Sequence, residues 1–168
     1  MSLSRTRPRV VLVRDAAGLL ARCALAAVWF VSGIAKAVDP RETVVAVRSY
    51  DLFPESLVGI IAAILPYFEL ALGVLLVVGL ATRLAAVLSV ILLVAFVAGV
   101  ISAAARGLTI DCGCFGGGGE VRADQTTYVE EILRDVGFLA LAGYLIVRPD
   151  TPLSIDRMVQ RRATASSP

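Results

Sequence analysis

The chain has 168 residues, 58% of them hydrophobic, and a formal net charge of only +2. Its mean hydropathy is +0.82, and soluble domains are typically about 45–50% apolar, so composition favours a one-domain integral membrane protein. Basic residues gather at the two ends instead of forming a stripe, which argues against nucleic-acid binding. The chain has no histidine, so it lacks the commonest general base and metal ligand.

A basic segment, residues 1–15, precedes the first long apolar stretch, residues 16–37. A spanning helix takes about 20 apolar residues, and in lipid it must be helical to satisfy its backbone amides. Its length, Arg22 inside it and the missing cleavage signal argue against a removed signal peptide. We expect Arg22 and Lys36 to anchor the two ends of this helix at the membrane interfaces. Cys23 is expected to pack as a small buried hydrophobe.

A helix-start signal follows the first stretch. In "DPRE", Asp39 stands at the N-cap, Pro40 at the first helical position and Glu42 at the third. The sequence therefore predicts a short surface helix over residues 40–49, outside the membrane.

The second apolar stretch, residues 57–80, contains Glu69 twelve residues from its start. At 1.5 Å per residue, this places the carboxyl group roughly 18 Å deep, near the bilayer midplane. Such a group needs a partner, and we expect the side chain of Arg134 to reach it. Three readings stay open: a polar clamp between helices, an acid of a proton path or quinone site, and a neutral glutamate with no special task.

A short turn with Arg83 leads to the third stretch, residues 84–105, which contains no charged residue. The loop after it, residues 106–127, holds "DCGCFGGGG". Cysteines two residues apart can form a disulfide, and Gly113 between them permits unusual backbone angles. The closed ring is very small, which predicts strain and a readily reduced, redox-active bond. The four glycines after Phe115 would let a partner protein approach the sulfurs.

Two other readings of Cys112 and Cys114 stay open. A metal site would need two further ligands, and without histidine these would be acids or groups from another chain. The pair can also be a structural staple or two inert thiols. Cys23 lies toward the other side of the membrane, too far for direct exchange, so a redox link to it would need a carrier such as a quinone.

The fourth stretch, residues 128–147, begins with Thr127 as the expected N-cap and Glu130 at the third helical position. Arg134 and Asp135 lie in its second turn, roughly 9–10 Å below the surface. The tail, residues 149–168, is polar and expected to fray.

The distribution of basic residues predicts the orientation. Nine lie on the side of the termini and the second turn, and five lie in the first and third loops, mixed with acids. The expected fold is an all-α, integral membrane four-helix bundle with both termini cytoplasmic. The two-cysteine loop and the short helix of the first loop would then face the oxidising side, where disulfides persist.

Four segments, "GIAKAVDP", "PYFELALG", "DCGCFG" and "LRD", resemble the MauE/DoxX family of membrane proteins over residues 16–148, and "CGCFG" points to its MauE branch. The resemblance implies disulfide formation or maturation of a secreted, disulfide-rich enzyme in methylamine utilisation, beside a thioredoxin-like partner. Other members are implied in membrane oxidoreductase assemblies. Residue by residue, the resemblance implies roles for Cys112, Cys114, Glu69, Arg134 and Asp135, and none for Cys23.

Two functions from different classes follow. The first is a bacterial plasma-membrane redox protein, a thiol–disulfide oxidoreductase component. Its cysteine pair would exchange electrons with a thioredoxin-like or secreted partner and, by analogy with other four-helix disulfide-forming membrane proteins, with a quinone near Glu69, Arg134 and Asp135. The alternative is a non-catalytic accessory or assembly subunit of a larger membrane complex. A solute or lipid carrier ranks last, because only Glu69 offers a polar group at the midplane.

Overall fold

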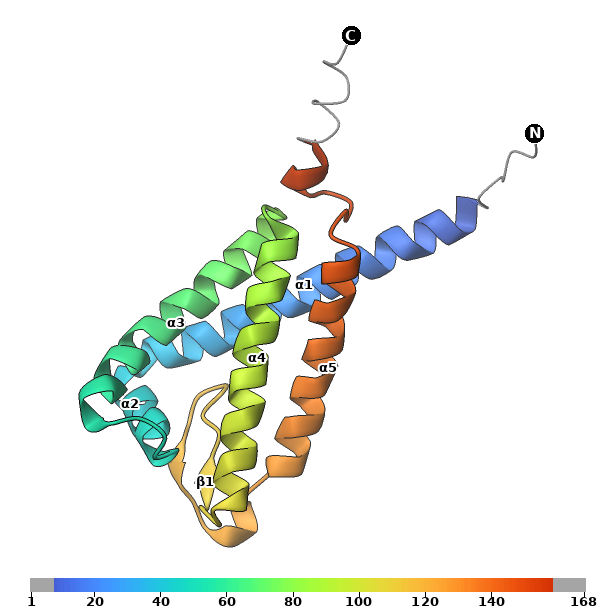
Figure 1. Cartoon of the computed structure of the whole chain (residues 1–168). Helices are drawn as coiled ribbons and strands as arrows, with labels where there is room; N and C mark the ends of the chain where they lie inside the picture. Colours follow the sequence, from blue (N-terminus) through green and yellow to red (C-terminus); the bar gives the residue numbers. More distant parts are fainter. Residues whose placement is uncertain (1–7, 159–168) are drawn as a thin grey trace.

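The computed structural model describes residues 8–158, and the chain is mostly helical (Figure 1). Four arginines of the two basic ends lie outside the described residues: Arg5, Arg7, Arg161 and Arg162. The elements, in chain order, are α1 (Pro8–Val38), α2 (Pro40–Ser49), α3 (Glu55–Val78), α4 (Thr82–Ala105), β1 (Ile110–Asp111), β2 (Gly119–Glu120), the 3-10 helix η1 (Ala123–Gln125) and α5 (Tyr128–Val147).

The four long helices form a closed ring, in which α1 packs on α3 and α5, and α4 packs on α5 and α3. The most extensive contacts join α1 to α3 and α4 to α5. At one end lie α2, β1, β2 and η1, which we call the hairpin end (Figure 1). At the other, which we call the tail end, the turn between α3 and α4 lies near the segment that follows α5 (Figure 1).

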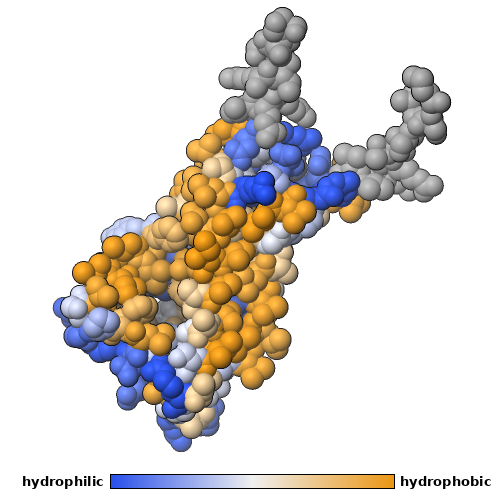
Figure 2. Space-filling view, viewed as in Figure 1, coloured by the Kyte–Doolittle hydropathy of each residue, from blue (hydrophilic) through white to orange (hydrophobic). Residues whose placement is uncertain are grey.

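Among residues 8–158, three helices are long and apolar enough to cross a membrane: α1 from Leu12, α3 and α4. The 20-residue α5 has the predicted bounds, but its first two turns contain Glu130, Glu131, Arg134 and Asp135, which lower its apolar character. Large apolar side chains such as Ile64 point outward from the bundle. Figure 2 shows the result, a broad hydrophobic belt between two hydrophilic ends.

The core lies where α1, α3, α4 and α5 meet, and it is built from leucine, alanine and one tryptophan. Leu25, Leu72, Leu76 and Leu145 are almost completely buried. The indole Nε1 of Trp29 donates a hydrogen bond to Ser89 Oγ at 2.8 Å, which gives the buried N–H the partner it needs. Alanines such as Ala85 and Ala86, with no exposed surface, let the helix backbones approach closely.

The two predicted helix caps turned out differently. The Asp39 carboxylate accepts the backbone N–H of Glu42 at 3.0 Å, so this N-cap and the helix over residues 40–49 are confirmed. Thr127 is the N-cap residue of α5, but its side chain makes no capping hydrogen bond. Its hydroxyl instead donates to Glu131 Oε1 at 3.1 Å, because the glutamate one turn later competes for it.

An all-α fold predicts no β-strands, but the loop after α4 contains two short ones. It folds into a small antiparallel hairpin in which Ile110 pairs with Glu120 and Asp111 pairs with Gly119. Tyr128 fastens the base of the hairpin, because its hydroxyl donates to the carbonyl of Leu108 at 2.7 Å and accepts the N–H of Ile110 at 3.0 Å. The two cysteines therefore lie in a closed loop at the tip of a hairpin.

At the tail end, two expectations about α1 are wrong. Arg22 does not extend to the headgroups: it is buried and donates to Thr151 Oγ1 at 2.7 Å and to the carbonyl of Leu153 at 3.0 Å. Its guanidinium thereby binds the segment after α5, which is docked on the bundle through the buried residues Thr151 and Ser154 and is not frayed there. Cys23 is an exposed free thiol, because it points away from the packed side of α1.

Candidate functional site

Cys112 and Cys114 form a disulfide at the tip of the hairpin, with Cα atoms 5.4 Å apart. Both residues are buried, with 6% and 9% of their surface exposed. They pack with Val100 of α4 and beneath the aromatic rings of Tyr50 and Phe115. The disulfide is therefore built into the end of the bundle and does not project from it.

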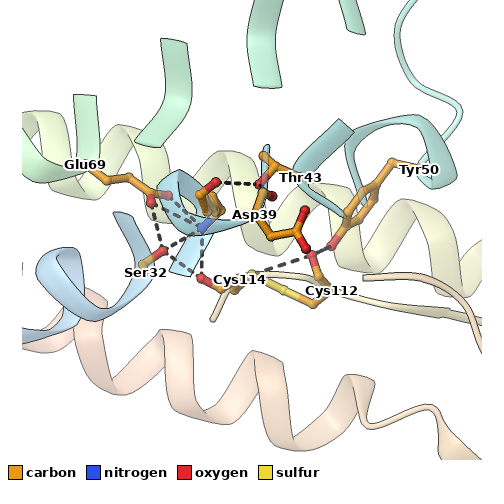
Figure 3. Close-up of polar contacts among 8 residues, drawn as sticks. Ser32, Asp39, Thr43, Tyr50, Glu69, Cys112 and Cys114 are labelled. Atoms are coloured by element: carbon orange, nitrogen blue, oxygen red, sulfur yellow. Dashed lines mark hydrogen bonds and ion pairs between the residues drawn. A yellow bond between two sulfur atoms is a disulfide. The ribbon is translucent and has the colours of Figure 1, made fainter. Parts of the chain in front are cut away.

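A buried ionic cluster holds this tip in place (Figure 3). The ammonium group of Lys36 contacts both oxygens of Glu69, at 3.1 and 3.2 Å. It also donates to Ser32 Oγ at 2.6 Å and to the carbonyl oxygen of Cys114 at 2.8 Å. Ser32 Oγ lies 2.9 Å from Glu69 Oε2 and 2.7 Å from the same carbonyl, and its single proton serves one of them at a time.

The cluster corrects the expected partner of Glu69. Its carboxylate pairs with Lys36 from α1, while Arg134 pairs with Asp135, its own neighbour on α5, at 3.1 Å. Lys36 is consequently no interface anchor, since its ammonium is buried among these partners. The pairing is decided by which faces of α1 and α3 meet. The expectation rested on how deep each residue lies along its helix, and depth does not determine which helix faces meet.

Two side chains from α2 and the loop after it complete the support. Tyr50 donates its hydroxyl to the carbonyl of Cys112 at 3.1 Å (Figure 3). Burial, followed by the nearby charge of Glu131, raises the pKa of Tyr50, so its hydroxyl stays protonated and able to donate. Thr43 Oγ1 donates to the carbonyl of Lys36 at 3.0 Å, which ties α2 to the end of α1.

The glycines of the loop serve close packing within the chain. Gly113 has φ of +66°, and a Cβ added there would lie 2.7 Å from the Cβ of Ala46 on α2. Gly118, with φ of +111°, would place a Cβ 2.4 Å from the same atom. Glycine is thus required for the backbone conformation and for the contact with α2. Access for a partner protein, the expected reason for these glycines, is not needed to explain them.

On the side of α5, the disulfide borders a polar cavity of about 400 Å³, which we call the outer cavity. Its walls include Cys112, Cys114, Phe115, Glu130, Glu131 and Arg134. The Arg134 guanidinium lies over the Phe115 ring, 4.6 Å from its centroid. Glu131 Oε2 and Arg134 Nη2 are buried and have no hydrogen-bond partner among the described residues. Both atoms have almost no accessible surface, so a polar group in the cavity would pair with them only after the side chains move.

The structure thus distributes the predicted residues unevenly. Cys112, Cys114 and Arg134 line the outer cavity, with Asp135 bound to Arg134, whereas Glu69 acts from the other side through Lys36. Ser32, Tyr50 and Glu131 were missed, because a serine, a tyrosine and a helix-start glutamate are common near membrane interfaces. The position of Lys36, one turn after Ser32 on the same helix face, could have indicated that the two side chains act together.

Within residues 8–158, no three histidine, cysteine, aspartate or glutamate side chains gather as a metal site would require. The geometry is instead that of an internal disulfide between a charged cluster and a polar cavity.

Comparison with known proteins gives one match. The family model described as methylamine utilisation protein MauE matches residues 14–148, which include most of α1, all of α3, α4 and α5, and the hairpin. No curated protein and no solved structure matches the chain. Because the family model covers most of its length, the chain belongs to the MauE family.

Proposed function

We propose that the protein exchanges thiols and disulfides with an extracytoplasmic partner through Cys112 and Cys114. The observation that carries this proposal is the position of the disulfide: it forms a wall of the outer cavity, beside the charged side chains of Glu131 and Arg134. MauE membership supports a membrane accessory protein that works with other proteins in methylamine utilisation or a related redox context.

The chemistry is a two-step exchange. A thiolate of the partner attacks one sulfur of the pair, forms a mixed disulfide and releases the other sulfur as a thiolate. A second partner thiol then attacks the mixed disulfide, so that the partner leaves oxidised and the pair is left as a dithiol. The Arg134 guanidinium would stabilise the thiolate that forms beside it, and the Glu131 carboxylate would accept or return the proton. The partner is a thioredoxin-like or secreted protein with a vicinal dithiol.

The proposed orientation puts the hairpin end outside a bacterial plasma membrane, with α5 as the fourth span and the tail end in the cytoplasm. Arg83 and Arg148 at the tail end support it, because cytoplasmic ends carry the excess of basic residues. A membrane-impermeant maleimide should label the reduced pair in intact cells. Labelling only after lysis would reverse the orientation.

The experiment that tests the function traps thiols in cells with acid, alkylates them with a maleimide that shifts mobility, and compares wild type with Cys112→Ser and Cys114→Ser. The wild-type pair should change state when cells receive reductant or oxidant. One single mutant should retain its partner in a mixed disulfide that mass spectrometry identifies. Cys23→Ser is the matched control, because its thiol is exposed but lies outside the hairpin, and it should behave as wild type.

A second candidate function is an accessory or assembly subunit in which the disulfide only staples the loop. The burial of both cysteines favours it, because a partner thiol must reach a sulfur to react. A pair that stays in one state, with both serine variants still supporting assembly of the partner complex, would select this candidate over thiol exchange.

A further inference from the structure

A second cavity borders the disulfide on the side opposite α5. Its volume is about 220 Å³, and its walls come from α2, α3, α4 and the tip of the hairpin. Leu65 of α3, Phe96 and Ala95 of α4, and Phe53 of the connecting loop provide apolar surface, and Cys112 and Cys114 are also among its walls. We call it the membrane-side cavity.

The position of this cavity follows from the way the helices pack. The helices α3 and α4 meet at the tail end and diverge toward the hairpin end, where α2 and the hairpin lie between them (Figure 1). Ala95 and Phe53, both wall residues, are exposed on the outside of the bundle, so the cavity lies close to the lipid-facing surface. We therefore take the bilayer beside α4 as the route of a ligand, although α2, which forms another wall, lies outside the predicted spans.

One charged side chain, Lys36, lies among the wall residues. Its ammonium is 5.7 Å from the centroid of the Phe96 ring and already contacts the carbonyl of Cys114. The cavity therefore combines an apolar wall, one cationic side chain and the disulfide. A ligand that fits this combination is lipid-soluble, flat, equipped with a hydrogen-bond acceptor, and able to exchange electrons with sulfur.

We propose that the membrane-side cavity binds the head group of a lipid-soluble quinone, which reoxidises Cys112 and Cys114. This inference rests on the proposed function, because it supplies the electron acceptor that turnover of the pair requires. The volume is below the roughly 300–1,000 Å³ of pockets that enclose a whole ligand, so the cavity takes the ring while the isoprenoid tail stays in the lipid. Glu69, Arg134 and Asp135, the residues expected to hold a quinone, are not among its walls.

The reaction balances without a further reagent. Two thiols, on Cys112 and Cys114, lose two protons and two electrons and form one S–S bond. The quinone gains two electrons and two protons and leaves as a quinol. The three N–H groups of Lys36 now serve Ser32, Glu69 and the carbonyl of Cys114. One of them would turn to the quinone oxygen on which negative charge develops.

The disulfide then separates two cavities of opposite character. The outer cavity is polar and suits the dithiol of a protein partner, and the membrane-side cavity is apolar and suits an electron acceptor from the bilayer. Both contain Cys112 and Cys114 in their walls, so a single cysteine pair would suffice to pass electrons between them.

The test uses the full-length protein in lipid nanodiscs and ubiquinone-1, a short-tailed quinone with every ring position substituted. The pair is reduced with dithiothreitol, the reductant is removed without oxygen, and ubiquinone-1 is added. Loss of quinone absorbance and loss of protein thiols should proceed together, one quinone for each pair. The reduction step tests the proposed function separately, because a pair that dithiothreitol cannot reduce would contradict thiol exchange. A pair that is reduced but not reoxidised by ubiquinone-1 would contradict only the quinone site.

Ala95→Phe fills the cavity with a ring and should slow reoxidation by ubiquinone-1 about tenfold or more, since a hydrophobic pocket discriminates strongly against lost volume. Ala98→Phe is the matched control, because Ala98 is an exposed alanine of the same helix that is not among the wall residues, and it should retain the wild-type rate. Equal rates in the two variants would overturn the proposal.

A second measurement needs no variant. Wild-type protein is photolabelled with an azido derivative of ubiquinone-1, and the adducts are located by mass spectrometry. Adducts should fall on peptides of α3 and α4 that contain Leu65 or Ala95, and excess ubiquinone-1 should suppress them. Adducts confined to other helices would contradict the site even if the phenylalanine variant fails to fold.

Discussion

Each end of the bundle has a buried basic side chain of α1 that binds a backbone carbonyl, but the other partners of the two side chains differ. At the hairpin end, Lys36 of α1 is buried and holds a backbone carbonyl of the hairpin, while at the tail end Arg22 of α1 is buried and holds the carbonyl of Leu153. Lys36 also has the carboxylate of Glu69 as a counter-charge. Arg22 has neutral partners, with Thr151 Oγ1 as its second acceptor.

The difference indicates what each end is for. A buried guanidinium bound to hydroxyl and carbonyl oxygens is sufficient to dock a polypeptide segment. A buried ion pair costs more desolvation and is a poor way to gain stability alone. At the hairpin end this arrangement stands beside a disulfide, whereas the tail end, which has cavities of its own, holds a segment without a cysteine. Docking is therefore common to both ends, and the proposed thiol exchange would use only the hairpin end.

The largest expected effect comes from breaking the ion pair. Glu69→Leu leaves the ammonium of Lys36 buried without its counter-charge and should destabilise the protein by about 3–5 kcal/mol. Thermal unfolding in detergent measures the loss. The double variant Lys36→Met/Glu69→Leu should recover most of it, because no uncompensated charge remains. A double variant as unstable as Glu69→Leu alone would show that the pair matters through packing and not through charge.

The next largest loss of stability is expected when a methyl group is added to a glycine at which the hairpin, or the segment after α5, contacts the rest of the bundle. Gly113→Ala should cost about 2–4 kcal/mol, from its positive φ and from the contact with Ala46. Gly79→Ala, at the tail end, should cost a similar amount, because its Cβ would lie 2.6 Å from the Cβ of Ser154. Unfolding in detergent measures both losses.

Gly107→Ala is the matched control for these two variants. Its φ of +68° is nearly the same, but no atom lies within 4 Å of the added Cβ, so only the backbone cost of about 1–2 kcal/mol applies. Ala46→Gly should rescue part of Gly113→Ala and none of Gly79→Ala. If all three alanine variants lose equal stability, the proposed contacts contribute nothing.

A smaller effect is expected at the tail end. Arg22→Met removes two hydrogen bonds without leaving a buried charge, so the loss should be about 1–3 kcal/mol. Limited proteolysis should cut the segment after α5 more readily. The rate at which dithiothreitol reduces the cysteine pair should stay at the wild-type value, and a changed rate would mean that the two ends are coupled.

The smallest effect concerns the helix caps. Asp39→Ala removes the hydrogen bond to the N–H of Glu42 and should cost about 1 kcal/mol. Thr127→Ala should cost less, because the threonine side chain does not cap its helix. Unfolding in detergent compares the two, and an equal loss would indicate that the contact of Thr127 with Glu131 substitutes for a cap.

The boundaries of the helices could be predicted from the residues alone, except the start of the first: α1 begins at Pro8, eight residues before the predicted span of residues 16–37. Residues 128–147 and 40–49 coincide with α5 and α2, and residues 57–80 and 84–105 each begin two residues after the start of α3 and α4. These features are local: the length of an apolar run, an N-cap aspartate and a proline act within one or two turns. The pairing of Cys112 with Cys114 was predictable for the same reason, because residues two positions apart in the sequence must lie close together.

The partners across helices required the tertiary structure. Lys36 and Glu69 lie 33 residues apart, and their contact depends on how α1 and α3 are rotated about their axes. Hydropathy does not encode that rotation. The burial of Arg22 against the tail, the packing of Gly113 on Ala46 and the two cavities beside the disulfide have the same origin. Each depends on surfaces that come together only when the four long helices close into a ring.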